Sequence, residues 1–126
     1  MERMKRRQDF VAAAKAFVQP MPAFLMQLRA RGDEKPARLG FTCTKKLGNA
    51  VARNLIRRRL KEAARLSLPT VTKPGFDYVV IGRSQGETRP FETIKADLIS
   101  ATLRLHAKAD SFNQRIENEP AANPAI

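Results

Sequence analysis

Several residue types that form common active sites are scarce in this sequence. Its 126 residues include one cysteine, Cys43, one histidine, His106, and no tryptophan. A single cysteine excludes an internal disulfide, and one histidine without further thiolate or imidazole ligands leaves no credible zinc site. The six glycines are scattered, and neither GxxxxGK[ST] nor GxGxxG occurs. The sequence therefore argues against metal, disulfide or nucleotide-loop chemistry carried by the chain itself.

Groups for acid–base or nucleophilic catalysis are equally few. Cys43 lies in a segment with strand character and is most simply a small buried hydrophobe. His106 follows Leu105 late in an expected helix, where a lone histidine is typically structural or faces solvent. The acidic pair Asp33–Glu34 falls in an expected loop, which does not fix the spacing of the two carboxylates. We predict that the chain holds no catalytic residue and that any reactive group comes from elsewhere.

Long apolar runs and acidic residues are also in short supply. No run approaches the roughly 20 apolar residues of a membrane span, and the N-terminus makes a poor signal peptide, which predicts a cytoplasmic location. The 12 acidic residues face 24 basic ones, giving a net charge of +12 and a pI near 10.9. This imbalance implies a polyanionic partner. The apolar fraction of 43% is that of a globular protein and excludes a disordered basic tail.

The order of the expected elements indicates one small α+β domain. Hydrophobic spacing predicts a helix over 7–17, strands over 23–29 and 38–44, a basic helix within 45–65, a strand over 76–82 and a final helix over 90–108. The segment 31–37 is predicted to be a hairpin connection between the first two strands. We expect the domain to cover 1–110 and the tail 111–126, which loses periodicity, to be disordered.

The basic helix is the feature around which the rest is arranged. On a helical wheel its cations and one amide share a side, formed by Arg53, Asn54, Arg57, Arg58, Lys61 and Arg65. The apolar side holds Val51, Leu55, Ile56, Leu60, Ala63 and Leu66, with Arg59 at its edge. A solvated surface face usually mixes charges of both signs, whereas only Glu62 is acidic here. The pattern favours a face that binds a polyanion.

The start of this helix adds further candidate contacts. Asn49 is the expected N-cap, and the amides near Gly48 and Asn49 lie at a helix N-terminus, which attracts anions. Lys45 and Lys46 enter the helix from the preceding strand. Asn54 within the cationic side either orients an arginine, reads a sugar or base edge, or is a tolerated surface residue. These features indicate nucleic-acid binding. Phe10 and Phe41 could stack on bases, although core packing is the commoner fate of a phenylalanine.

One string makes the prediction specific. KKLGNAV at 45–51, followed by Arg53-Asn54 and the arginine run 57–59, closely resembles the RNR signature of the bacterial ribonuclease P protein subunit. That signature reads approximately KK-x-GNAV-x-RN-x-x-[KR]-R. The segment RMKR at 3–6 with Asp9-Phe10, and the strand DYVVIGR at 77–83, are similar to the family's flanking segments. The resemblance covers roughly residues 3–108.

The resemblance implies a small mostly antiparallel sheet packed by helices, with a left-handed βαβ crossover. It also implies a subunit that binds a large catalytic RNA, which uses Mg²⁺ to remove the 5′ leader from precursor tRNA, so the chain alone would be inactive. The leader would occupy a cleft beside Phe10. By position, the family's RNA contacts fall on Lys45, Lys46, Asn49, Arg53, Asn54, Arg57, Arg58 and Lys61.

Two positions depart from the family pattern, and one other function explains part of the sequence. Leu55 stands where the family often has the last arginine of RNR, and its place on the apolar side suggests the least direct RNA contact. Ala14 stands where members often have a second aromatic, so leader contact would depend more on charge and on the sheet face. A ribosomal or ribosome-assembly protein that only scaffolds RNA would explain the basic helix equally well, but not the GNAV-x-RN string.

Overall fold

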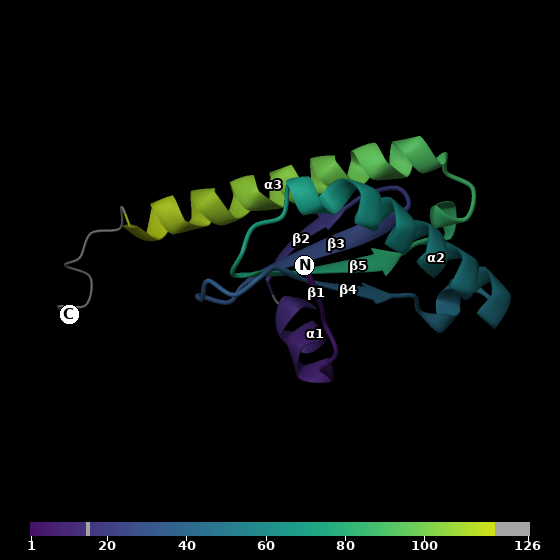
Figure 1. Cartoon of the computed structure of the whole chain (residues 1–126), viewed down its shortest axis with the longest axis horizontal. Helices are drawn as coiled ribbons and strands as arrows, with labels where there is room; N and C mark the ends of the chain where they lie inside the picture. The colour runs from purple at the N-terminus through teal and green to yellow at the C-terminus, as the bar shows by residue number, and fades with distance from the viewer. Residues whose placement is uncertain (15, 118–126) are drawn as a thin grey trace.

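The computed structural model describes residues 1–14 and 16–117, which form a five-stranded sheet with helices on both faces (Figure 1). The elements along the chain are β1 (Glu2–Arg3), α1 (Arg7–Ala14), β2 (Phe17–Pro20), β3 (Phe24–Ala30), β4 (Arg38–Thr42), η1 (Lys45–Leu47), α2 (Ala50–Ser67), η2 (Leu68–Thr70), β5 (Phe76–Gly82), η3 (Ser84–Gly86) and α3 (Phe91–Glu117). This confirms the predicted α+β class. None of the described helices combines the length and apolar character needed to span a membrane.

The sheet is mixed, with strand order β1-β4-β5-β3-β2. β1 and β5 both run parallel to β4, whereas β3 runs antiparallel to β5 and to β2. Adjacent parallel strands need a crossover, and α2 provides it between β4 and β5. The structure thus contains the βαβ unit implied by the sequence resemblance, and its left-handed sense stays a prediction.

The main core lies between the sheet and the helices α2 and α3, which cover one face (Figure 1). Its fully buried side chains include Phe24, Met26, Leu28, Ile56, Leu60, Tyr78, Val80, Ile94, Leu98 and Leu105. α1 lies against the opposite face, where a smaller apolar cluster joins Met4, Phe10, Val79 and Ile81. Because α2 buries one side against this core, its other side is fixed outward.

Ion pairs at one end of the sheet connect α1 to three strands. Asp77 on β5 is fully buried and pairs with Arg31 at 2.6 Å and with Arg38 at 2.7 Å. Asp9 on α1 pairs with Arg38 at 3.2 Å and with Arg29 at 3.4 Å. Although burial raises the pKa of Asp77, the hydrogen bonds and charges of Arg38 and Arg31 outweigh it and lower the pKa overall. These arginines are thus engaged within the fold.

Two predictions about the first half of the chain are wrong. The first helix ends at Ala14 and not at Phe17, and Phe17–Pro20 forms edge strand β2, because this segment pairs with β3 and the rings of Phe17 and Phe112 lie 5.7 Å apart. The segment 31–37 is not a hairpin, because β5 lies between β3 and β4. Instead it passes the start of β5, where Gly75 exchanges backbone hydrogen bonds with Arg31 and Lys35.

The final helix and the apolar side of α2 also differ from prediction. α3 continues past Lys108 to Glu117, because no proline or glycine occurs in 109–117 to end it, so residues 111–117 are not the expected disordered tail. Residues 118–126 lie outside the described part of the chain. On α2, Val51 and Leu66 are exposed rather than buried, because at about 100° per residue both lie outside the buried stripe of Ile56, Leu60, Ala63, Ala64 and Ser67.

Candidate nucleic-acid interface

The loop before α2 has the backbone geometry that its sequence predicts. Gly48 has a φ of 124°, a conformation that side-chain-bearing residues rarely adopt. Asn49 follows as the N-cap, and its side-chain oxygen accepts a hydrogen bond from the amide of Ala52 at 3.0 Å. Lys45 and Lys46 lie exposed in η1, directly before this cap. Gly48 and Asn49 therefore fix the angle at which α2 leaves the sheet, with two lysines beside its N-terminus.

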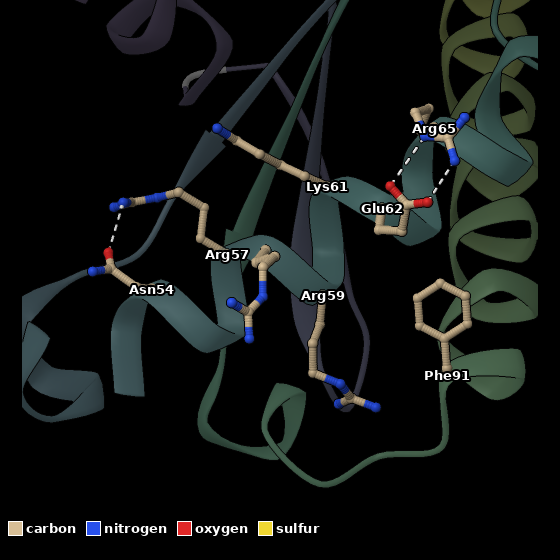
Figure 2. Close-up of a pocket in the computed structure, with 8 residues that line it drawn as sticks. Asn54, Arg57, Arg59, Lys61, Glu62, Arg65 and Phe91 are labelled. Atoms are coloured by element: carbon tan, nitrogen blue, oxygen red, sulfur yellow. Dashed lines mark hydrogen bonds and ion pairs between the residues drawn. The ribbon is translucent and has the colours of Figure 1, made fainter. Parts of the chain in front are cut away.

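The predicted cationic side of α2 faces outward. Asn54 and Arg58 are exposed, whereas Arg53, Arg57 and Lys61 are half-buried. Figure 2 shows that Arg57 and Lys61 extend from the helix in the same general direction as Asn54. Among the described residues, the Nε of Arg53 is the buried side-chain nitrogen that has no hydrogen-bond partner. This face can offer guanidinium and ammonium groups to several phosphates at once.

Two polar contacts within α2 involve residues of its cationic side. The amide oxygen of Asn54 accepts a hydrogen bond from Arg57 at 3.4 Å, which supports the interpretation that Asn54 orients an arginine. Arg65 donates two hydrogen bonds to Glu62, one of them at 3.0 Å (Figure 2). This pairing lowers the pKa of Glu62 and raises that of Arg65. Arg65 is thus partly neutralised, unlike Arg58, and is the weaker of the two as an anion contact.

Arg59 has a role that the helical wheel did not reveal. Its guanidinium donates to the backbone carbonyls of Gly86 and Arg89, the latter at 2.7 Å. Arg89 in turn pairs with Asp97 on α3 at 2.7 Å. Arg59 therefore fastens α2 to the connection between β5 and α3, and it is not free to contact RNA. No feature of the sequence indicates this role beyond an arginine at the edge of an apolar side.

The two predicted aromatic residues line one small cleft, although they come from different layers. Phe10 on α1 and Phe41 on β4 border a space of about 240 Å³ with Arg3, Arg57 and Lys61. A Cβ on Gly40 would lie 2.6 Å from the ring of Phe10, so this glycine is needed for α1 to sit where it does. Lys61 lies 6.0 Å from the centroid of the Phe41 ring. The cleft joins aromatic walls to the cationic face of α2.

Electrostatics in this cleft favour an anion. Burial, together with the nearby charges of Arg3 and Arg57, lowers the pKa of Lys61. All the charged side chains that line the cleft are basic: Arg3, Arg57 and Lys61. An anionic group placed between them would relieve their mutual repulsion. In the sequence Arg3 is only one residue of the family's N-terminal segment, and the fold brings it here by pairing β1 with β4.

The structure also places the scarce residues that could have carried other chemistry. Cys43 is buried beside the apolar core, and His106 is buried with its Nε2 2.7 Å from the hydroxyl of Tyr78. Asp33 pairs with Arg31 at 3.0 Å. Within residues 1–14 and 16–117, histidine, cysteine, aspartate and glutamate nowhere gather in threes to hold a metal ion. The cationic groups on and beside α2 thus form the candidate interface.

The fold and this site together define a small basic protein that presents one helix to a polyanion. The family model described as Ribonuclease P matches residues 1–106. The chain belongs to the ribonuclease P protein family, whose members are protein subunits of an endoribonuclease. This agrees with the sequence resemblance and not with a ribosomal protein.

Relatives and solved structures agree with this assignment. The Ribonuclease P protein component of Ruegeria pomeroyi is 50% identical over 107 residues, covering 82% of this chain and 86% of that protein. The component of Caulobacter vibrioides is 46% identical, covering 91% and 78%. The RNase P protein structure from Thermotoga maritima matches with a TM-score of 0.67 and 28% identity over 82% of this chain and 97% of that one. The structure from Staphylococcus aureus gives 0.66 and 26%, covering 80% and 92%.

Proposed function

We propose that the cationic face of α2 docks the chain on the RNA subunit of ribonuclease P, as part of the enzyme that matures the 5′ end of tRNA. The observation that carries this proposal is the outward face with Arg53, Arg57, Arg58 and Lys61, preceded by Lys45 and Lys46 at a capped helix N-terminus. Acidic residues are absent from positions 45–61, so phosphates meet no repulsive group within that stretch.

The cleft beside α1 is the proposed site for the single-stranded leader of precursor tRNA. Phe10 and Phe41 supply ring surfaces, and Arg3, Arg57 and Lys61 supply positive charge at the same space. Arg57 and Lys61 also line the larger hollow on the outer side of α2. A leader in the cleft would therefore lie against the same helix that holds the catalytic RNA, which would place the substrate next to the catalyst.

Cleavage is assigned to the RNA subunit in this proposal. Mg²⁺ would be held by RNA phosphates, and the protein's cations would lower the repulsion between two RNA molecules. Three of the described carboxylates support this division, because Asp9 and Asp77 are paired with arginines and Glu62 is paired with Arg65. The chain's contribution is thus binding and orientation, in the cytoplasm where tRNA is processed.

Reconstitution tests the proposal. The chain is mixed with a catalytic RNA from the same source and a precursor tRNA, and cleavage is followed at several Mg²⁺ concentrations. The chain alone should not cleave, while its addition should lower the Mg²⁺ demand of the RNA and raise affinity for precursor over mature tRNA. Efficient cleavage by the chain alone would overturn the division of labour, and recovery of ribosomal RNA in a pull-down would overturn the partner.

A matched pair of variants tests the face itself. Arg58→Gln and Arg65→Gln remove the same charge from the same helix, but Arg65 is already paired with Glu62. We expect Arg58→Gln to weaken binding to the catalytic RNA by about 1–3 kcal/mol, as for a charge-assisted contact, and Arg65→Gln to weaken it less. Filter binding at fixed salt measures both. Equal losses would show that net charge, and not this geometry, sets the affinity.

A further inference from the structure

A half-buried aromatic ring, that of Phe91 at the start of α3, borders the outer hollow of α2. Phe91 lines a space of about 710 Å³ together with side chains of α2, namely Asn54, Arg57, Arg58, Arg59, Lys61, Glu62 and Arg65. In Figure 2 Phe91 lies to the right of α2, whereas Arg57 and Lys61 extend to the left. The cationic face thus has an aromatic ring on this side as well as at the Phe10–Phe41 cleft.

The position of Phe91 is fixed by the contacts of Arg59. The guanidinium of Arg59 reaches the carbonyls of Gly86 and Arg89, so the chain that leads into α3 is held against α2. The pair between Arg89 and Asp97, at 2.7 Å, fixes the same segment to the second turn of α3. Phe91 follows Arg89 by two residues. The backbone at Phe91 is therefore held against α2, and the partly buried ring packs against the main core, so it is in place before any ligand arrives and less entropy is lost on binding.

The surroundings of the ring suit a nucleotide better than an apolar ligand. Lys95 lies 5.7 Å from the centroid of the Phe91 ring, and Arg58 is exposed across the hollow without a carboxylate partner among the described residues. The acidic groups nearby, Glu62 and Glu92, are paired with Arg65 and Lys95. A ring that can stack on a base, next to cations that can hold its phosphates, is the combination used for unpaired nucleotides.

We infer that Phe91 stacks on an unpaired base of the catalytic RNA and that Arg58 of α2 holds a phosphate next to that base. This inference rests on the proposed docking of α2 on that RNA. It adds a contact that charge does not supply, and it makes Arg59 the positioning residue for the ring. A base pair within a duplex cannot offer its face to the ring, so the site selects a bulge, loop or junction.

Affinity measured over a salt series separates stacking from charge. Phe91→Leu keeps an apolar side chain but removes the flat ring, and Phe91→Tyr keeps the ring. We expect Phe91→Leu to bind the catalytic RNA about ten-fold more weakly, with the slope of log affinity against log salt unchanged, because no cation is lost. Phe91→Tyr should bind like wild type. Wild-type affinity in Phe91→Leu would overturn the inference, and so would a reduced slope.

Footprinting at saturating protein keeps the test valid if Phe91→Leu loosens the fold. Base-specific chemical probing of the catalytic RNA should show a nucleotide that wild type and Phe91→Tyr protect and Phe91→Leu leaves reactive, while other protections persist. Identical footprints for all three chains would overturn the inference. If Arg58→Gln weakens binding but Phe91→Leu does not, the inference alone fails. If neither substitution weakens binding, both the inference about Phe91 and the proposed docking of α2 are overturned.

Discussion

At the scale of single residues, several side chains act through geometry that composition does not show. Gly48 and Asn49 start α2 at a fixed angle, and Arg59 fastens its middle to the β5–α3 connection. Gly40 leaves room for Phe10, which brings α1 to the edge of the leader cleft. The residues in and around the arginine-rich helix α2 therefore form two groups: some position the interface, and others face outward.

Gly40→Ala should disturb the packing of α1. The added Cβ would lie 2.6 Å from the Phe10 ring and 3.2 Å from the Cβ of Met4, so the ring must move. We expect a loss of about 1–3 kcal/mol in the free energy of unfolding, as for other overpacked sites, measured by denaturant titration. A double-mutant cycle with Phe10→Leu supplies the control, because the smaller side chain should absorb part of the loss. Strict additivity would contradict the clash.

His106 should make the stability of the chain sensitive to acid. The amide of Lys73 donates to the Tyr78 oxygen at 2.9 Å, and this oxygen lies 2.7 Å from Nε2 of His106; when Nε2 is unprotonated, the Tyr78 hydroxyl can donate to it. Burial, with the charge of Lys73, lowers the pKa of His106 below 6.5. The unfolded chain therefore takes up a proton first, and the free energy of unfolding should fall as pH drops below about 6.5.

The matched variant for this prediction is His106→Gln, which keeps a hydrogen-bond acceptor for Tyr78 but does not titrate in this range. Thermal unfolding at a series of pH values from about 7 to 5 compares the two chains. Wild type should lose stability relative to the variant as pH falls, and the difference should level off below the lowered pKa of His106. Parallel curves for the two chains would mean that His106 does not titrate in this window.

At the scale of elements, α2 is a two-sided helix whose faces have separable functions. Its buried stripe holds Ile56, Leu60 and Ala63 and continues to Ser67, whereas Val51 and Leu66 lie outside it and are exposed. The apolar side of the wheel is therefore wider than the buried stripe. Substitutions along one apolar side should therefore differ sharply in cost.

Leu60→Ala and Val51→Ala test this difference. Leu60 is 1% exposed within the main core, so its truncation should lower the free energy of unfolding by about 2–4 kcal/mol. Val51 is 76% exposed, so its truncation should change that quantity by no more than about 0.5 kcal/mol. Urea titration of both chains gives the comparison. Similar losses at the two positions would show that the burial of α2 is misassigned.

Local signals explain which elements could be predicted from the sequence. The Asn49 cap and the spacing of Ile56 and Leu60 belong to α2 itself, so its start and its buried middle follow from sequence alone. The pairing of β5 between β3 and β4 does not, because a connection over 31–37 can close a hairpin or pass the end of another strand. Phe17 likewise becomes strand through its pairing with β3 and its contact with Phe112.

The candidate site likewise has one part that the sequence predicts and one part that only the fold shows. The cations of α2 were predicted because they lie on one helix, at spacings that a wheel can display. Arg3 precedes this helix in the chain and Phe91 follows it, and only the folded arrangement brings both to it. The engagement of Arg59 with backbone carbonyls and of Arg65 with Glu62 depends on rotamers and neighbours. Sequence periodicity therefore predicts the face, while the fold decides which of its members are available.

At the scale of the whole molecule, the carboxylates are distributed so that positive charge is concentrated on one side of α2. Asp9 and Asp77 neutralise arginines at the end of the sheet, and Asp97 pairs with Arg89 at the start of α3. On α2, Glu62 comes after the stretch that carries Arg53, Arg57 and Arg58. The net charge of +12 is thus not spread evenly over the surface. It is directed toward the face proposed to meet RNA.

Binding to the catalytic RNA should accordingly depend steeply on salt. Each phosphate neutralised by the protein releases counterions, so contact with roughly five or more phosphates gives a slope of log affinity against log salt with a magnitude of about four or more. Arg58→Gln should reduce that magnitude by about 1, because one phosphate contact is lost. Lys108→Gln is the control, because Lys108 lies on α3, away from the cationic side of α2, and its Nζ already donates to the carbonyl of Val18 at 2.7 Å. A flat salt dependence of wild type, or an equal change in both variants, would contradict a directed interface, because affinity would then follow total charge and not its placement on α2.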